Sequence, residues 1–317
     1  MELEEYAKKY IPIALAGFTL FFVFLIGGIF SDDGEQGRLG VMLRDQEKES
    51  PFAALSLEAK AVIVWDIQKG IPLYVYNEEA QLPLASLSKM MTVVLAQEDL
   101  PEGSLVEIGE DAIRREGDSG FRVGERFLPQ NLIDLTLISS SNDGAYALAS
   151  AVLAAHVQHD NTISTLSFAG RMNKKAREIG LGQTFFINET GLDTVNNTSG
   201  GYGSAKDVAS LLTYIVKKHP HLLEATQLSS YDTPSVEGKN HSASNTNKSI
   251  TFLPAVLGSK TGFTDLAGGN LAIVFEAGPL YPIVVVVLGS TAEDRFTDVE
   301  KLVWATLESL SDSSDIR

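Results

Sequence analysis

The chain has 317 residues, of which 44% are hydrophobic and 21% are charged, so it can bury a full core as one large domain or two small ones. Its formal net charge of -16 argues against a nucleic-acid partner, because phosphate binding needs clustered lysine and arginine. The absence of cysteine excludes disulfides, thiolate zinc sites and a cysteine nucleophile.

An uncharged run at residues 11–30 follows a short polar segment at 1–10. As a helix this run would span roughly 30 Å, the thickness of the hydrocarbon core of a bilayer, so it predicts a transmembrane anchor. A cleaved signal peptide is the alternative, but its apolar region would be shorter and would end in a small-x-small site. Lys8 and Lys9 precede the run, which predicts a cytoplasmic N-terminus and an extracytoplasmic remainder.

Residues 31–58 are polar and lack a sustained period, which is typical of a linker. We expect the folded domain over 59–311, followed by a short tail at 312–317. Two β-branched and aromatic runs, at 61–66 and 73–76, predict a hairpin at the start of this domain.

The stretch QLPLASLSKMMTVVLA at 81–96 passes from a loop into an apolar helix. If Ser86 opens that helix, Lys89 lies one turn later and its amine returns to the Ser86 hydroxyl. A serine becomes a nucleophile when a base takes its proton, and a lysine can be that base where burial or a nearby cation lowers its pKa. A helix N-cap followed by a solvated lysine has the same pattern, so the pair needs support from elsewhere in the chain.

The remainder of the chain alternates between a helical block and strands. Apolar spacing predicts helices at 129–138, 144–157, 164–179 and 206–217, the last with Ser204 as its cap. Strands follow at 255–260, 271–276 and 282–288, and a final helix at 294–310. Strands at both ends with helices inserted between them predict an α+β fold, in which an antiparallel sheet is flanked by helices and joined to a helical subdomain.

Two further polar clusters accompany Ser86 and Lys89. Ser140-Ser141-Asn142 lies in the break between two apolar helices, where its side chains would project from a loop, although an N-cap has the same composition. Lys260-Thr261-Gly262 lies at the end of a predicted strand, where it offers a cation, a hydroxyl and a residue that permits close approach of a ligand backbone. A Ser-x-x-Lys, a Ser-x-Asn and a Lys-Thr-Gly in this order form the signature of penicillin-recognising serine enzymes.

The chain resembles the serine-type D-alanyl-D-alanine carboxypeptidases of peptidase family S11, which are low-molecular-mass penicillin-binding proteins. The likeness covers roughly residues 60–310 and includes LPLASLSKMMT, LISSSNDGAYALA and GSKTGFTDLAGGN. It implies a β-lactamase/transpeptidase-like fold, peptidoglycan stem peptides ending in D-Ala-D-Ala as substrates, β-lactams as covalent inhibitors and no cofactor or metal. With the predicted anchor, it implies a single-pass protein of the bacterial cytoplasmic membrane whose N-terminal helix contacts the lipid bilayer.

The resemblance also implies catalytic roles for four residues. Ser86 would attack the carbonyl of the penultimate D-alanine, and Lys89 would take its proton. Ser140 would relay a proton toward the leaving D-alanine, and Asn142 would orient the substrate amide or Lys89.

It implies substrate-binding roles for the residues on the later strand. Lys260 and Thr261 would hold the terminal carboxylate of the substrate. The N–H groups of Ser86 and Phe263, which follows Gly262, would form the oxyanion hole.

Two positions depart from the family pattern, because Ser141 stands where glycine is common and Gly269 where a larger residue is common. A β-lactamase remains an alternative, with Glu189 as the candidate base for deacylation, as does a D,D-endopeptidase. A catalytically silent peptidoglycan-binding protein is a further alternative. The five histidines lie outside the three clusters, so a Ser-His-Asp triad has no candidate.

Overall fold

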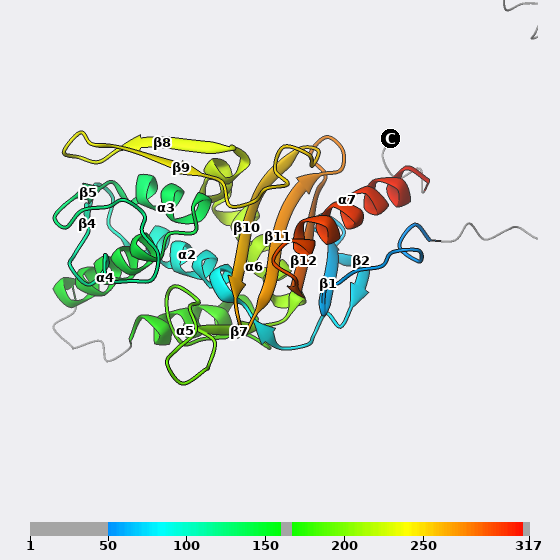
Figure 1. The fold of residues 1–317 in the computed structure, drawn as a ribbon, viewed down its shortest axis with the longest axis horizontal. Coiled ribbons are helices and arrows are strands. Elements are labelled where there is room, and N and C mark those ends of the chain that lie inside the picture. The colour runs from blue at the N-terminus through cyan, green and yellow to red at the C-terminus, as the bar shows by residue number, and fades with distance from the viewer. Residues whose placement is uncertain (1–49, 160–166, 313–317) are drawn as a thin grey trace, which may run out of the picture. The chain divides into compact units, whose positions relative to one another are not determined.

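The computed structural model describes residues 50–159 and 167–312 (Figure 1). Within these residues, no helix combines the length and apolarity that a bilayer-spanning segment needs. The predicted cytoplasmic segment at 1–10 and the predicted anchor at 11–30 lie outside the described residues, as does most of the predicted tail.

A five-stranded antiparallel sheet forms the centre of the domain, with the strand order β10-β11-β12-β1-β2. Ala61 in the first strand pairs with Leu288 in the last, so the two ends of the domain meet in one sheet, as the sequence predicted. Strand β10 lies at an edge. The strands are β1 (Ala61–Asp66), β2 (Ile71–Tyr76), β10 (Val256–Thr264), β11 (Gly268–Glu276) and β12 (Pro282–Ser290).

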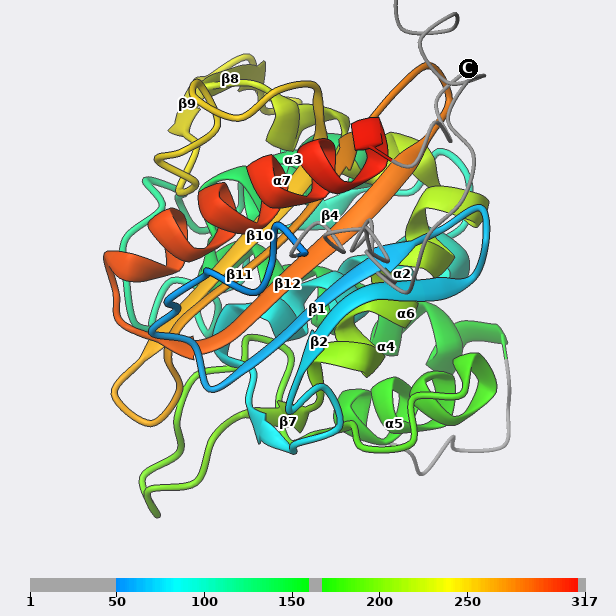
Figure 2. The same cartoon turned by 90° about the vertical axis from the view of Figure 1, so that its right-hand side faces the viewer.

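Helices cover both faces of the sheet. Helix α7 (Asp294–Asp312) crosses one face diagonally (Figure 2), and α6 (Ala205–Lys218) packs on the other. Successive strand residues point to opposite faces, so a strand between two helical layers must be apolar at every position. Strand β12 meets this need with two sets of fully buried residues, Ile283, Val285 and Val287 toward α7 and Val284, Val286 and Leu288 toward the other core.

A helical part lies beside β10 (Figure 1). It consists of α2 (Lys89–Asp99), α3 (Pro129–Ile138), α4 (Asn142–His159) and α5 (Phe168–Ile179). Helix α3 begins with Pro129 in its first turn, as expected. Helix α6 begins at its expected cap, where the Ser204 hydroxyl accepts from the Asp207 N–H at 3.1 Å. Shorter elements connect these parts, namely β3 (Leu82–Pro83), η1 (Ala85–Ser88), β4 (Val106–Glu107), β5 (Arg126–Phe127), β6 (Phe185–Phe186), β7 (Gly201–Gly203), η2 (Pro220–Gln227), β8 (Ser230–Pro234) and β9 (Asn240–Ser244).

Three sequence expectations differ from the structure. Residues 50–58, expected to be linker, pack on the sheet, because Phe52 is buried and stacks on Tyr74 with ring centroids 4.9 Å apart. The linker expectation extended the polar character of residues 31–49 over a segment that contains apolar residues such as Phe52 and Leu55. Lys260-Thr261-Gly262 lies inside β10 and not at a strand end, since the strand continues to Thr264. Ser86 lies in the 3₁₀ turn η1, and the α-helix begins three residues later at Lys89.

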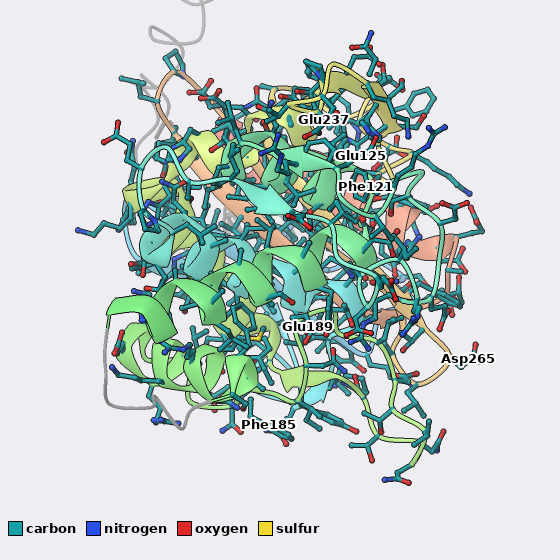
Figure 3. All side chains as sticks on the ribbon, turned by 90° about the vertical axis from the view of Figure 1, so that its left-hand side faces the viewer. Phe121, Glu125, Phe185, Glu189, Glu237 and Asp265 are labelled. Atoms are coloured by element: carbon teal, nitrogen blue, oxygen red, sulfur yellow. The ribbon has the colours of Figure 1, made fainter. Side chains whose placement is uncertain are left out.

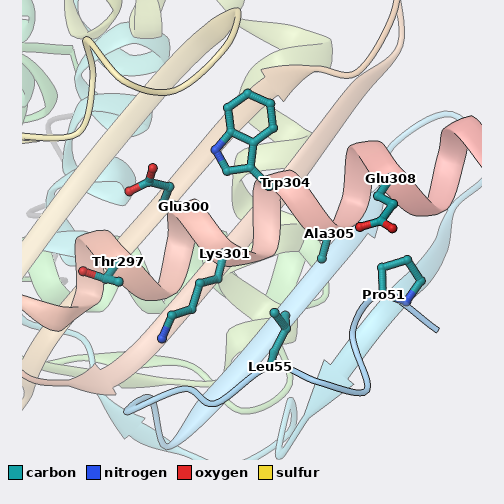
Figure 4. A pocket seen from close by; sticks show the side chains of 8 residues that line it. All are labelled: Pro51, Leu55, Thr297, Glu300, Lys301, Trp304, Ala305 and Glu308. Atoms are coloured by element: carbon teal, nitrogen blue, oxygen red, sulfur yellow. The ribbon is translucent and has the colours of Figure 1, made fainter. Parts of the chain in front are cut away.

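A groove on the α7 side of the sheet contains none of the predicted site residues. It lies between residues 51–55 and the outer face of α7, where Trp304 is half-exposed (Figure 4). The three motifs converge elsewhere, at the edge of the sheet formed by β10.

Candidate active site

The turn that carries Ser86 is held between two strands. Ala85 adopts a φ of 48°, a left-handed conformation that disfavours residues with a Cβ. The Leu84 N–H donates to the Gly201 carbonyl at 2.9 Å. On the other side, a Cβ at Gly262 would lie 2.9 Å from the Leu84 oxygen and 3.3 Å from the Ser86 nitrogen. Glycine at 262 therefore lets β10 pass directly beside the backbone N–H of Ser86.

Lys89 directs its amine at Ser86 from a fully buried position. Its Nζ donates to the Ser86 Oγ at 2.8 Å and to the Thr190 carbonyl at 2.8 Å, and its side chain is fully buried. Burial lowers the pKa of Lys89 from 10.5 to about 7, against the opposing effect of the Glu189 charge. A large fraction of Lys89 is therefore neutral near pH 7, which allows the amine to accept a proton.

A second buried lysine shares the site. Lys260 is 1% exposed, and its Nζ donates to the Thr261 carbonyl at 2.9 Å. Burial lowers the pKa of Lys260 well below its usual value, and the positive charges of Lys89 and Arg295 lower it further. Because this repulsion is mutual, a charged Lys260 favours a neutral Lys89.

The Ser-x-Asn segment joins the site from the start of α4. Ser140 adopts a φ of 62° and is half-buried. The Asn142 Nδ2 donates to the Glu116 carbonyl at 2.7 Å, while its Oδ1 is buried without a partner among the described residues. Among the described residues, no hydrogen bond therefore joins this segment to Lys89.

The unusual Ser141 has a local function in the fold. Its hydroxyl accepts from the Gly144 N–H at 2.9 Å and forms a 2.6 Å hydrogen bond with the Ser119 hydroxyl. It therefore satisfies an N–H in the first turn of α4 and ties the loop at residue 119 to the Ser-x-Asn segment. A glycine could supply neither bond.

Thr246 connects two of the three motifs and was not predicted as a site residue. Its N–H donates to the Ile138 carbonyl at 3.0 Å, two residues before Ser140, and its hydroxyl lies 2.7 Å from the Thr261 hydroxyl. It thereby links the α3–α4 break to β10. No pattern near Thr246 in the sequence indicates this contact.

Arg295 was also missed, because it lies on α7, far along the chain from the motifs. Its side chain donates to the Gly262 carbonyl at 2.7 Å. Gly269 makes this approach possible, since a Cβ there would collide with the Thr291 carbonyl at the start of the segment that leads into α7. A third cation thus lies beside Lys260.

The histidines that the structure describes in full lie in other contacts. His156 hydrogen-bonds Asp99 at 3.0 Å. His241 packs against the rings of Phe121 and Phe127. In Figure 3, Phe121 lies above α4 and Glu189 lies below it. Within residues 50–159 and 167–312, no cluster of three His, Cys, Asp or Glu side chains is arranged to hold a metal ion.

The fold and this geometry define the class of penicillin-binding proteins. The solved structure of penicillin-binding protein D2 from Listeria monocytogenes with ampicillin bound is similar, with a TM-score of 0.63 and 27% identity over 79% of this chain and 98% of that one. A family model described as D-alanyl-D-alanine carboxypeptidase matches residues 46–292. The chain therefore belongs to the D-alanyl-D-alanine carboxypeptidase family, which confirms the resemblance seen in the sequence.

Curated relatives carry two related names. D-alanyl-D-alanine carboxypeptidase DacF of Bacillus subtilis is 31% identical over 255 residues, which cover 78% of this chain and 62% of the relative. A D-alanyl-D-alanine endopeptidase of Pseudomonas aeruginosa is 27% identical over 264 residues, 80% of this chain and 79% of the relative. The chain thus spans less than two thirds of the length of DacF.

The lowered pKa of Lys89 predicts a pH-dependent stability. Between pH 7 and 10.5 the unfolded chain holds a proton on Lys89 that the folded chain has lost, so folding stability rises with pH in this window. Lys89→Met removes this contribution. The free energy of unfolding of Lys89→Met should exceed that of the wild type by the largest amount at or below pH 7. This difference should shrink by on the order of 4 kcal/mol as the pH rises to 10.

Urea unfolding of both proteins at the two ends of this window measures the change. The exposed Lys217→Met on α6 controls for the loss of a lysine from the surface. A difference between wild type and Lys89→Met that stays constant with pH would contradict the prediction.

Proposed function

We propose that this protein is a serine D-alanyl-D-alanine carboxypeptidase that removes the terminal D-alanine from peptidoglycan stem peptides through an acyl-enzyme on Ser86. The observation that carries the proposal is the 2.8 Å hydrogen bond between the Lys89 Nζ and the Ser86 Oγ in a site where burial lowers the pKa of Lys89 to about 7. This is the arrangement that an activated serine requires without a histidine base.

In the proposed acylation step, neutral Lys89 takes the proton of Ser86 as the Oγ attacks the carbonyl carbon of the penultimate D-alanine. The developing oxyanion is held by the backbone N–H groups of Ser86 and Phe263. The close passage of Gly262 beside the Ser86 nitrogen supports this pairing, because fixed donors at a developing charge need no reorganisation during the reaction.

The proposed departure of D-alanine requires a proton on its amine. We assign this relay to Ser140, whose backbone projects from the break between α3 and α4. Asn142 is assigned to orient the substrate amide. Its Oδ1 is buried without a hydrogen-bond partner in residues 50–159 and 167–312, which supports this role, since a substrate N–H would satisfy this acceptor.

The proposed carboxylate site is formed by Lys260 and Thr261, with Arg295 as a further cation. Lys260 lies in β10 and Arg295 reaches the adjacent Gly262 carbonyl from α7. Burial lowers the pKa of Lys260 and repulsion from Lys89 and Arg295 lowers it further, and a bound carboxylate would relieve that repulsion. Binding of an acidic substrate terminus therefore makes a positive charge on Lys260 more favourable.

A β-lactamase is the second candidate, and one observation favours it. Burial lowers the pKa of Lys89 and the charge of Glu189 opposes that effect, so this carboxylate acts electrostatically on the proposed base. A D,D-endopeptidase would use the same residues on cross-linked peptides, and one of the relatives carries that name.

We further propose that residues 11–30 anchor the protein in the cytoplasmic membrane, with the catalytic domain on the extracytoplasmic side. The uncharged run supports this, as does the pair Lys8 and Lys9 before it. Peptidoglycan, the proposed substrate, lies on that side.

Ser86→Ala should abolish acylation and lower release of D-alanine by about a thousandfold or more, because it removes the nucleophile. Intact-protein mass spectrometry after incubation with benzylpenicillin, with peptide mapping of the adduct, measures acylation. Ser150→Ala, an exposed serine of α4, is the control and should form the adduct normally. Retained release of D-alanine by a folded Ser86→Ala variant would refute the mechanism.

Glu189→Gln should shift the pH of half-maximal acylation downward by about half a unit, because it removes a negative charge that raises the pKa of Lys89. The lifetime of the penicillin adduct should stay as in the wild type. A much longer lifetime in the variant would instead identify Glu189 as the base for deacylation and favour the β-lactamase. Glu102→Gln, in an exposed turn, serves as control.

Deletion of residues 2–30 should release the protein from membranes. The full chain should remain in the membrane pellet after washing with high salt and alkaline carbonate, which strip peripheral proteins. Recovery of the full chain in the wash would contradict the proposed anchor.

A further inference from the structure

We propose that Asn188 is the positioning residue that aims Lys89 at Ser86, because its side chain folds residues 188–192 into a turn that presents the Thr190 carbonyl to the Lys89 amine. This role deepens the proposed function and rests on it, since it concerns the step in which Lys89 takes the proton of Ser86.

The Asn188 side chain closes the turn on its own backbone. Its Oδ1 accepts from the Thr190 N–H at 3.1 Å, the Thr190 hydroxyl at 3.0 Å and the Gly191 N–H at 2.7 Å. Its Nδ2 donates to the Leu192 carbonyl at 2.9 Å. One amide thus satisfies four groups and fixes the direction of the peptide between residues 190 and 191.

The turn docks on the first turn of α2. The Thr190 carbonyl accepts from the Lys89 Nζ at 2.8 Å, and the Glu189 carbonyl accepts from the Thr92 hydroxyl at 2.7 Å. Lys89 and Thr92 are three residues apart and share one face of the helix. The carbonyls of Glu189 and Thr190, which follow each other in the turn, therefore both bind side chains on that face.

The same turn contacts the residue before the nucleophile. Gly191 has a φ of 80°, and a Cβ there would collide with the Ala85 carbonyl. Residues 188–192 therefore contact both sides of the catalytic pair, at Ala85 and at Lys89.

This geometry determines where the lone pair of a neutral Lys89 points. A carbonyl oxygen can only accept, so Lys89 must keep an N–H directed at Thr190. Its other close partner is the Ser86 Oγ at 2.8 Å, which can donate. Because one N–H of Lys89 is held by the Thr190 carbonyl, the lone pair on the Lys89 Nζ can turn toward the Ser86 hydroxyl. Loss of that carbonyl from its place would let the amine rotate away.

The turn has attachments that do not depend on Asn188 side-chain atoms. The N–H groups of Ile187 and Asn188 both donate to the Gly200 carbonyl, at 2.8 and 3.1 Å, and Thr92 holds Glu189. Replacement of the Asn188 side chain should therefore loosen the Thr190 carbonyl and leave the segment attached to the domain.

The experiment measures acylation of the full chain by benzylpenicillin at several pH values, separating the limiting rate from the non-covalent dissociation constant. Asn188→Ala should lower the limiting rate at least about tenfold and change the dissociation constant by less than about twofold, because the base is misplaced while the binding groups remain. Asn196→Ala, at the exposed tip of the same loop, should behave as the wild type.

Asn188→Asp is the conservative variant. It keeps an oxygen for the N–H groups of Thr190 and Gly191 but adds a negative charge. That charge should raise the pKa of Lys89 and move the acid limb of the rate profile to higher pH, with the rate approaching that of the wild type above it. The other charges that act on this site, Glu189, Lys260 and Arg295, are the same in every variant.

A wild-type limiting rate and pH profile in Asn188→Ala would overturn the proposal. If thermal unfolding shows that Asn188→Ala does not fold, Asn188→Asp decides, and an unshifted acid limb in that variant would overturn it. If the wild-type chain itself forms no adduct, the proposed function fails, and that result differs from an adduct that forms equally well in all variants.

Discussion

The site depends on the burial of two lysines next to each other. Lys89 and Lys260 are 0% and 1% exposed, and an ammonium removed from water costs several kcal/mol unless it is paired. Within the part of the chain that the structure describes, neither lysine has a carboxylate in hydrogen-bond contact; their nitrogens meet the Ser86 hydroxyl and the carbonyls of Thr190 and Thr261. Such partners compensate only part of the cost, so the pKa of each lysine lies below its value in water. Burial thereby gives Lys89 a pKa at which its amine can act as a base near neutral pH.

Close backbone contacts hold the segments of this site together. Gly262 lets β10 lie against the Ser86 turn, and Gly191 lets the turn at 188–192 lie against Ala85. A side chain at either position would force apart segments that the chain brings together from distant parts of its length. These glycines therefore act through what they allow to approach, and the left-handed φ of Gly191 adds a conformational requirement.

The parts predicted from the sequence are those with a local cause. Periodic apolar residues gave α3 and the core of β12, and the spacing of Ser86 and Lys89 gave their contact. The Thr190 carbonyl could not be predicted, because any residue has a carbonyl and only the fold chooses which one meets Lys89. Arg295 was missed for a related reason, since its contact with Gly262 depends on how α7 packs and not on a pattern near the motif.

The position of Arg295 shows how the two faces of the sheet cooperate. The apolar side of α7 is fixed by a core on one face, through Val299 and Leu302 among others, while the Ser86 turn and α2 belong to the core on the other. The two meet at β10, the edge strand that carries Lys260. Because Lys260 comes from β10 and Arg295 from α7, their separation depends on how α7 packs on the sheet. The affinity for a carboxylate that bridges them would therefore depend on how the two layers pack against each other. The proposed binding of the substrate terminus is thus sensitive to packing far from the nucleophile.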